Sequence, residues 1–401
     1  MTRELDVAIV GYGPVGQALA AMLARAGHRV AAFERYREIY RLPRAVHIDH
    51  EIMRLLQGLG LADRLADEML PLGEYRWFGA DGEELLTLTA ETPARSGWEP
   101  DYLFFQPELE GALDEACAAA GATVQRGWVA EDLLDEPDGV TLAVRRHEEL
   151  DPGSLEPTEE TDTVRARWLV GADGANSFVR ETRGIPRRDL GFAERWLVVD
   201  VEPDDIEALG DLPTACQWCD PVRPTTHVQS GPRHRRWEFM LLPGERAEDF
   251  DDEQRVWSLL GPWFRPGDGS LVRSAVYEFR SMLAERMREG RTLLVGDAAH
   301  LTPPFLGQGL CSGLRDAANV AWKLDLVLRG RADEALLDTI TDERQAQNEW
   351  VISFAVELGR ILCELDPAAA ATRDASLRAL DAAPPIEYPD LAGGAVRRPA
   401  A

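Results

Sequence analysis

Three glycines near the N-terminus have the spacing of a phosphate-binding turn. Gly11, Gly13 and Gly16 form the pattern G-x-G-x-x-G, with Pro14 and Val15 between the second and third glycine. The first glycine permits a tight turn, the second lets the backbone approach a pyrophosphate, and the third lets a following helix pack closely. The free N–H groups and positive dipole end of such a helix favour an anion. The pattern therefore predicts a dinucleotide site.

The flanking residues predict the elements that such a turn requires. Residues 5–10 (LDVAIV) are an apolar run typical of a buried parallel strand, and residues 17–27 (QALAAMLARAG) predict a helix that stops at Gly27. Residues 28–35 (HRVAAFER) predict a second strand that ends at Glu34, with Arg35 beside it. A carboxylate about 20 residues after the glycines suits ribose hydroxyls. It favours FAD or NAD over the 2′-phosphate of NADP.

Two later motifs also place an aspartate where an apolar run ends. In residues 164–180 (VRARWLVGADGANSFVR), a predicted strand runs into Asp173. In residues 296–317 (GDAAHLTPPFLGQGLCSGLRDA), Gly296 and Asp297 follow the apolar residues 293–295. A carboxylate at such a position is either an N-cap or loop group, or an acceptor for a bound ligand.

Composition excludes several classes of function. The chain has 401 residues, enough for more than one domain, and a formal net charge of -27, which disfavours nucleic acid and anionic membranes as partners. Five cysteines, an odd number widely spread, argue against a disulfide framework. Cys216 and Cys219 form a C-x-x-C without a second ligand pair, so no metal is expected. The sequence lacks a signal-type N-terminus and a membrane-length apolar run, and a cytoplasmic location is expected.

The three motifs together resemble those of the FAD-dependent aromatic hydroxylases, the single-component flavoprotein monooxygenases. They are G-x-G-x-x-G, A-D-G-x-x-S-x-x-R at 172–180, and G-D-A-A-H-x-x-P-P-x-x-G-Q-G at 296–309, and the resemblance covers about residues 5–365. Further likeness to 3-(3-hydroxyphenyl)propionate hydroxylase-like members lies in PRAVHID, FFQPELEGAL, SGLRDAANVAWKL and LGRILCELDPAAAATRDA. Members of that type often continue into a thioredoxin-like region, and this sequence, which ends at Ala401, is either a naturally short member or a truncated chain.

The resemblance implies an α/β fold of the p-hydroxybenzoate hydroxylase type. A Rossmann-like FAD-binding domain is expected from residues 1–74, 100–182 and 283–365. A mostly antiparallel β-sheet substrate domain is expected from residues 75–99, which form a hairpin, and 183–282. Residues 366–401 are expected to be a C-terminal tail. The acidic stretch 147–163 predicts a solvated surface loop.

The resemblance also assigns cofactor residues. Asp297 with Gly296 would bind the ribityl chain of FAD, and Pro304 would lie beside the isoalloxazine. Backbone N–H groups of the segment 307–310 would meet the flavin pyrimidine edge; the residues concerned are Gly307, Gln308, Gly309 and Leu310. Cys311 stands where many members carry asparagine, so a thiol is expected near the flavin.

Three other positions match family cofactor contacts. Arg44 would lie near the FAD ribose and pyrophosphate, and Gln106 near the phosphate and ribityl chain. Asp173 would serve both FAD and the pyridine nucleotide. A solvated arginine at position 44 and a helix-cap glutamine at position 106 are the structural alternatives.

The implied reaction uses NADH or NADPH and O2 to hydroxylate a phenolic aromatic substrate through a flavin hydroperoxide. Two alternatives are open. One is a Baeyer–Villiger or epoxidising reaction on a polyketide-like substrate, and the other is an FAD-binding chain inactive without a partner. The expected partners are a small aromatic substrate and O2, and the chain allows a homodimer.

Catalytic and substrate residues are less constrained by the sequence. His47 could relay a proton with Asp49 orienting it, or both could simply hold their loop. Trp237 and Phe239 share one strand face by alternation. Arg223 or Arg235 could pair with a substrate carboxylate. The aromatic candidates for packing against a substrate ring are Trp218, Trp237, Phe239 and Tyr277.

Overall fold

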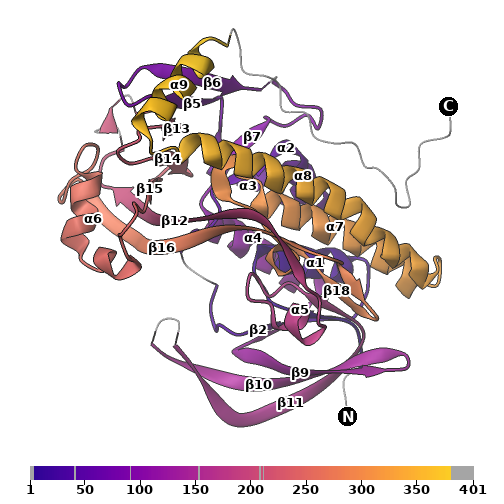
Figure 1. The fold of residues 1–401 in the computed structure, drawn as a ribbon. Coiled ribbons are helices and arrows are strands. Elements are labelled where there is room, and N and C mark those ends of the chain that lie inside the picture. The colour runs from indigo at the N-terminus through magenta and orange to yellow at the C-terminus, as the bar shows by residue number, and fades with distance from the viewer. Residues whose placement is uncertain are drawn as a thin grey trace, which may run out of the picture.

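A largely parallel sheet forms the first half of the framework (Figure 1). The computed structural model describes residues 4–39, 42–90, 92–151, 154–206, 209–210 and 212–380, with only the backbone at 150 and 151. Apolar runs form the central strands, as predicted, because both faces of this sheet are covered. In spatial order the main strands are β17 (Arg288–Glu289), β18 (Thr292–Leu294), β11 (Ser154–Gly171), β1 (Glu4–Val10), β2 (Val30–Glu34) and β8 (Thr123–Arg126).

Helices α1 (Pro14–Arg25), α4 (Gln106–Ala120) and α7 (Gly309–Leu328) pack together beside this sheet. The long helix α8 (Thr339–Leu362) runs alongside α7 (Figure 1). Shorter helices are α2 (His50–Leu59), α3 (Ala62–Glu68) and α5 (Phe178–Thr182). Among the described residues, no helix is both long and apolar enough to cross a membrane.

The second eight-stranded sheet is mostly antiparallel. Its hairpin of β5 and β6 joins through β13, as predicted for this segment. Helix α6 (Glu253–Leu260) packs beside it. In spatial order the strands are β19 (His300–Leu301), β16 (Gly269–Ala284), β12 (Arg187–Pro203), β15 (His234–Met240), β14 (Thr225–Ser230), β13 (Ala215–Trp218), β5 (Glu74–Phe78) and β6 (Glu84–Thr89).

A small third sheet is formed by three short strands, which lie in the sequence between strands of the two large sheets. Its strands are β3 (His47–Asp49), β7 (Asp101–Leu103) and β4 (Leu70–Pro71). Pairing of β3 with β7 brings the 43–49 segment and the start of α4 together. The division of the chain into two discontinuous domains stays a prediction.

The described part of the acidic stretch, residues 147–151 and 154–163, is not a loop. It belongs to a twisted ribbon of β9 (Trp128–Glu136), β10 (Gly139–Asp151) and β11, which lies at the opposite end of the molecule from β5 and β6 (Figure 1). Charged residues suit this ribbon because most of its outer residues are exposed, and cross-strand pairs such as Arg145–Glu131 (2.6 Å) support it.

The first part of the expected C-terminal tail is a helix, α9 (Pro367–Arg378). Asp366 caps it by accepting from the N–H groups of Ala368 and Ala369. Arg378 pairs with Asp81 at 2.8 Å, which fastens the helix to the β5–β6 hairpin. Residues 381–401 lie outside the described residues.

Candidate functional site

A cavity of about 2760 Å³ lies between the two large sheets. One wall carries the predicted cofactor residues, all of which line the cavity except Gly16 and Gly296. The opposite wall is the face of the second sheet formed by alternate residues of its strands. Three motifs that are far apart in the sequence therefore meet at a single site.

The glycine-rich turn is built by close backbone contacts. Gly11 has φ +95°, and a Cβ there would lie 2.3 Å from the carbonyl oxygen of Ala172. A Cβ at Gly16 would lie 2.3 Å from the carbonyl oxygen of Gly11, so α1 packs directly on the turn. A Cβ at Gly13 would meet nothing within 4 Å. The turn is therefore tight on its inner side and open toward the cavity, where the N-terminus of α1 begins at Pro14.

Glu34 joins the glycine-rich turn to the end of β2. Its carboxylate accepts from the backbone N–H of Tyr12 at 2.8 Å and of Tyr36 at 3.1 Å. Glu34 and Arg35 both line the cavity. Asp173 plays a similar part at α5, where it accepts from Ser177 Oγ at 2.5 Å and Val179 N–H at 3.0 Å. Burial raises the pKa of Asp173.

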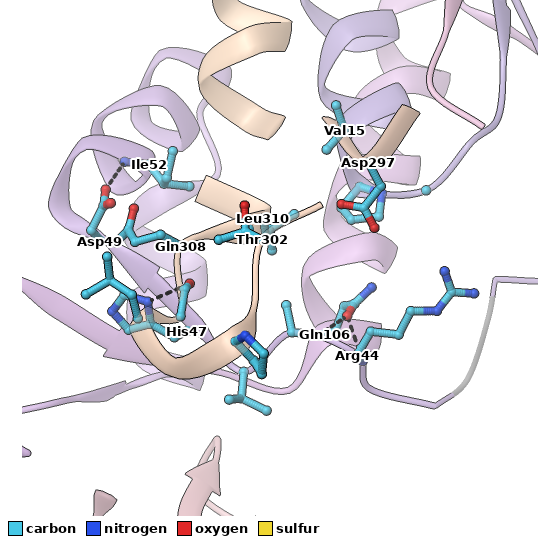
Figure 2. Close-up of a pocket in the computed structure, with 18 of the residues that line it drawn as sticks. Val15, Arg44, His47, Asp49, Ile52, Gln106, Asp297, Thr302, Gln308 and Leu310 are labelled. Atoms are coloured by element: carbon cyan, nitrogen blue, oxygen red, sulfur yellow. Dashed lines mark hydrogen bonds between the residues drawn. The ribbon is translucent and has the colours of Figure 1, made fainter. Parts of the chain in front are cut away.

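Asp297 has a free carboxylate. It is exposed to the cavity and makes no hydrogen bond to any other residue in the described part of the chain. Figure 2 shows this carboxylate below Val15, directed into the space that also faces Gln106 and Arg44. The turn at Gly296 and Asp297 is fixed by Asp316, which accepts from the Gly296 N–H at 3.0 Å.

Asp316 belongs to a buried cluster that sequence reasoning missed. Its carboxylate contacts His300 Nε2 at 2.6 Å and Arg344 Nε at 2.7 Å. Burial alone would raise the pKa of Asp316, but these two partners lower it to about 2. The only sequence signal was the position of Asp316 in SGLRDA, one residue after Arg315. The cluster fixes the backbone that presents Asp297.

His47 supports the segment 307–310. Its Nδ1 lies 3.1 Å from the Gly307 carbonyl oxygen (Figure 2). Its Nε2 lies 2.8 Å from Asp101 Oδ1. Both partners are acceptors, so both ring nitrogens must donate, which only the imidazolium can do. Burial would lower the pKa of His47, but the Asp101 hydrogen bond and charge outweigh it and raise that pKa well above 6.5.

Asp49 does not orient His47, so that prediction is wrong. Its carboxylate caps α2 by accepting from Glu51 N–H at 3.1 Å and Ile52 N–H at 3.2 Å. It also pairs with Arg315 at 2.6 Å. The carboxylate that contacts His47 is Asp101, which reaches it because β7 pairs with β3.

Gln106 acts through the backbone of the Arg44 segment. Its Oε1 accepts from the N–H group of Arg44 at 2.8 Å (Figure 2) and from that of Ala45 at 2.7 Å. Its Nε2 donates to Glu110 at 2.6 Å. Burial raises the pKa of Glu110 to about 7. Cys311, expected near the flavin, is fully buried behind His47 and is not among the cavity-lining residues.

Three of the four aromatic substrate candidates are on the wrong face of the second sheet. Trp237 and Phe239 share a face, as predicted, but that face packs against α6 and the residues after it. The ring centroids of Trp237 and Phe264 are 6.3 Å apart, and those of Trp218 and Trp263 are 4.8 Å apart. Trp237 and Phe239 are core because the segment around α6 covers them, and the half-buried Trp218 packs on Trp263 of the same segment.

Tyr277 does line the cavity, as predicted for a substrate residue. Neither arginine proposed for a substrate carboxylate is among the cavity-lining residues. Arg223 is paired with Glu245 at 2.8 Å, and Arg235 donates to the His234 carbonyl oxygen at 3.0 Å.

Comparison with known proteins identifies the family. A family model described as FAD binding domain matches residues 4–355. A probable NADH-specific resorcinol 4-hydroxylase of Rhodococcus jostii (strain RHA1) is 41% identical over 98% of this chain and 73% of its own length. A 3-(3-hydroxy-phenyl)propionate/3-hydroxycinnamic acid hydroxylase of Escherichia coli (strain SMS-3-5 / SECEC) is 33% identical over 96% of this chain and 68% of its own. The chain belongs to the FAD-dependent aromatic hydroxylases.

Solved structures agree with this hydroxylase fold. Aklavinone-11 hydroxylase, solved with FAD and aklavinone, has a TM-score of 0.79 at 29% identity and covers 93% of this chain and 71% of its own. The p-nitrophenol 4-monooxygenase PnpA of Pseudomonas putida DLL-E4 has a TM-score of 0.84 at 24% identity, with 94% of each chain covered. The p-hydroxybenzoate hydroxylase type of fold predicted from the motifs is confirmed.

FAD fits the residues that this hydroxylase presents. The open space over Gly13 and the free N–H groups of α1 suit a pyrophosphate. The Asp297 carboxylate, without a protein partner among the described residues, suits a ribityl hydroxyl. The start of α7 after Gly307 offers backbone N–H groups and a positive dipole end to the ring.

Proposed function

We propose that this hydroxylase adds one oxygen atom of O2 to a phenolic ring, with NADH as the reductant. The observation that carries the proposal is the shared cavity, in which a cofactor wall faces a polar sheet surface with room for a small aromatic molecule. The relative at 41% identity is named as an NADH-specific resorcinol hydroxylase, which supports both the ring and the reductant.

The proposed cofactor contacts follow from the geometry. Asp297 would accept from the ribityl chain, Glu34 from the adenosine ribose, and the turn at Gly13 would face the pyrophosphate. Gln106 would hold the Arg44 segment in place by its two backbone hydrogen bonds. The chemistry that FAD supplies when bound is electron acceptance from the nicotinamide and activation of O2.

We propose His47 as a positioning residue rather than a proton relay. Both of its nitrogens are occupied, by Gly307 and by Asp101, so neither faces a substrate. Its part is to fix the carbonyl of Gly307 and thereby the N–H groups of the following residues. Asp49, through Arg315, anchors the same region from the α2 side.

Steady-state kinetics with product analysis tests the proposal. Purified protein loaded with FAD is mixed with NADH or NADPH and a panel of phenols, and absorbance at the nicotinamide band is followed. We expect oxidation of NADH that is stimulated by a phenol and yields an oxygenated product. FAD binding without stimulation by any phenol would refute it. A cytoplasmic location and a homodimer stay predictions.

A further inference from the structure

A row of hydrogen-bonding side chains crosses four neighbouring strands of the second sheet on the cavity side. Tyr75 on β5, Gln217 on β13, Thr226 on β14 and Glu238 on β15 all line the cavity. Register places Gln217 opposite Thr226 and Thr226 opposite Glu238. Three members of the row are buried: Gln217, Thr226 and Glu238, at 1%, 7% and 7% exposure. Burying polar groups costs free energy unless they find hydrogen-bond partners.

The hydrogen bonds inside the row fix what it can offer a ligand. Gln217 Nε2 donates to Tyr75 Oη, and Thr226 Oγ1 donates to Gln217 Oε1 at 2.5 Å. The Tyr75 hydroxyl hydrogen is therefore left to donate, and the Thr226 oxygen is left to accept. Glu238 makes no hydrogen bond to another described residue, and its nearest cation, Arg236, is 3.8 Å away.

The two arginines beside the row, Arg236 and Arg273, form hydrogen bonds to other parts of the protein. Arg236 Nε donates to Asp200 at 2.7 Å, and its Nη atoms donate to the carbonyl oxygens of Arg44 and Pro43, each at 2.7 Å. Arg273 also donates to the Pro43 carbonyl oxygen and stacks on Tyr277. Both guanidinium groups therefore already bind protein acceptors, whereas the Glu238 carboxylate makes no hydrogen bond to another described residue.

Thr226 and Glu238 are spaced to bond one ring at two points. Directly opposite residues of an antiparallel pair have Cβ atoms about 4.5–5.5 Å apart, which is comparable with the spacing of two meta hydroxyl oxygens. A ring with hydroxyls at both points would give the Thr226 oxygen a donor and the Glu238 carboxylate a donor.

We propose that the row Tyr75–Gln217–Thr226–Glu238 makes this enzyme selective for a neutral benzene ring carrying two hydroxyl groups over a phenol carrying a carboxylate. This inference rests on the proposed function. Glu238 is its specificity-determining residue, because it is the acceptor that a second hydroxyl satisfies and a carboxylate opposes.

Three substrates test the selectivity of the FAD-loaded enzyme: resorcinol, 3-methoxyphenol and 3-(3-hydroxyphenyl)propionate. We expect kcat/KM for resorcinol to exceed that for 3-methoxyphenol by about tenfold or more, since one donated hydrogen bond to a carboxyl group is lost. The carboxylated phenol should be poorer still. Equal or higher kcat/KM for the carboxylated phenol would overturn the inference but leave hydroxylation intact. No turnover of any phenol would instead overturn the proposed function.

The variant Glu238→Gln tests the assigned residue. It keeps the size of the side chain and removes the charge, so the preference for resorcinol over the carboxylated phenol should fall by about tenfold or more. Glu194→Gln is the matched control, because Glu194 lies on β12 of the same sheet but does not line the cavity. The Glu194→Gln variant should prefer resorcinol over the carboxylated phenol by the same ratio of kcat/KM as the parent.

FAD absorbance checks that each variant is folded and loaded. If Glu238→Gln fails to load FAD, Thr226→Val takes its place and should lower kcat/KM for resorcinol more than for 3-methoxyphenol. An unchanged preference in a loaded variant would contradict the assignment.

Discussion

At the scale of single residues, the most informative side chain is Asp297, a carboxylate that is exposed to the cavity and unpaired within the described chain. Hydrogen bonds to a charged group contribute about 1.5–3 kcal/mol each. Asp297→Asn should therefore weaken FAD binding by about tenfold to a hundredfold, measured by flavin fluorescence titration. Asp204→Asn, an exposed position away from the cavity, should bind FAD as the parent does. Equal FAD affinity in both variants would remove Asp297 from the cofactor site.

His47 makes stability depend on pH. Its folded-state pKa is raised above the ordinary value of 6.5, so its stabilising contribution is complete below pH 6.5 and is lost as pH rises through the folded-state pKa. We expect the Tm difference between the parent and His47→Gln, both loaded with FAD, to shrink on raising the pH from 6 toward 10. A Tm difference that stays constant over this range would contradict an imidazolium at this position.

Sequence alone allowed predictions for residues whose motifs are local. The spacing of Gly11, Gly13 and Gly16 and the Gly296–Asp297 pair are readable because each motif works within one turn. Asp101 was missed because its partner His47 is 54 residues away and only the β3–β7 pairing joins them. Asp316 was missed for the same reason, since its partners His300 and Arg344 are 16 and 28 residues distant.

At the scale of elements, the glycines on either side of α1 differ in what a side chain would cost. One position requires a positive φ alone, and the other also requires space. Gly11 and Gly27 both have positive φ, +95° and +90°, but only at Gly11 would a Cβ collide with another segment. Gly27→Ala should cost about 1–2 kcal/mol in unfolding free energy. Gly11→Ala should cost about 1–3 kcal/mol more, because Ala172 must move. Urea unfolding of both variants measures this, and equal losses would show that the contact with Ala172 yields freely.

Strand alternation predicts which residues share a face but not what covers that face. Trp237 and Phe239 do lie together, yet α6 covers them, and the cavity receives Arg236 and Glu238 instead. Composition misled in the same way at 147–163, where acidic residues indicated a loop. Such residues are compatible with a strand whose faces meet water, as in β10 and β11.

At the scale of the whole molecule, Arg236 ties the second sheet to the cofactor segment. It pairs with the fully buried Asp200 and donates to the backbone of residues 43 and 44. Arg236→Leu should lower the unfolding free energy by about 3–5 kcal/mol, because it leaves the buried Asp200 with only the more distant Arg273, at 3.8 Å. The double variant Asp200→Leu with Arg236→Leu should lose less than Arg236→Leu alone. A larger loss in the double variant, measured by the same urea unfolding, would argue against this pairing.

The measurement that most directly tests the whole proposal is product analysis under labelled oxygen. FAD-loaded protein, NADH and resorcinol are incubated under ¹⁸O₂, and the product is examined by mass spectrometry and NMR. We predict one labelled oxygen in a new ring hydroxyl, with NADH consumed in step with the product. NADH consumption that yields only hydrogen peroxide with every phenol tested, or a product whose new oxygen is unlabelled, would contradict it.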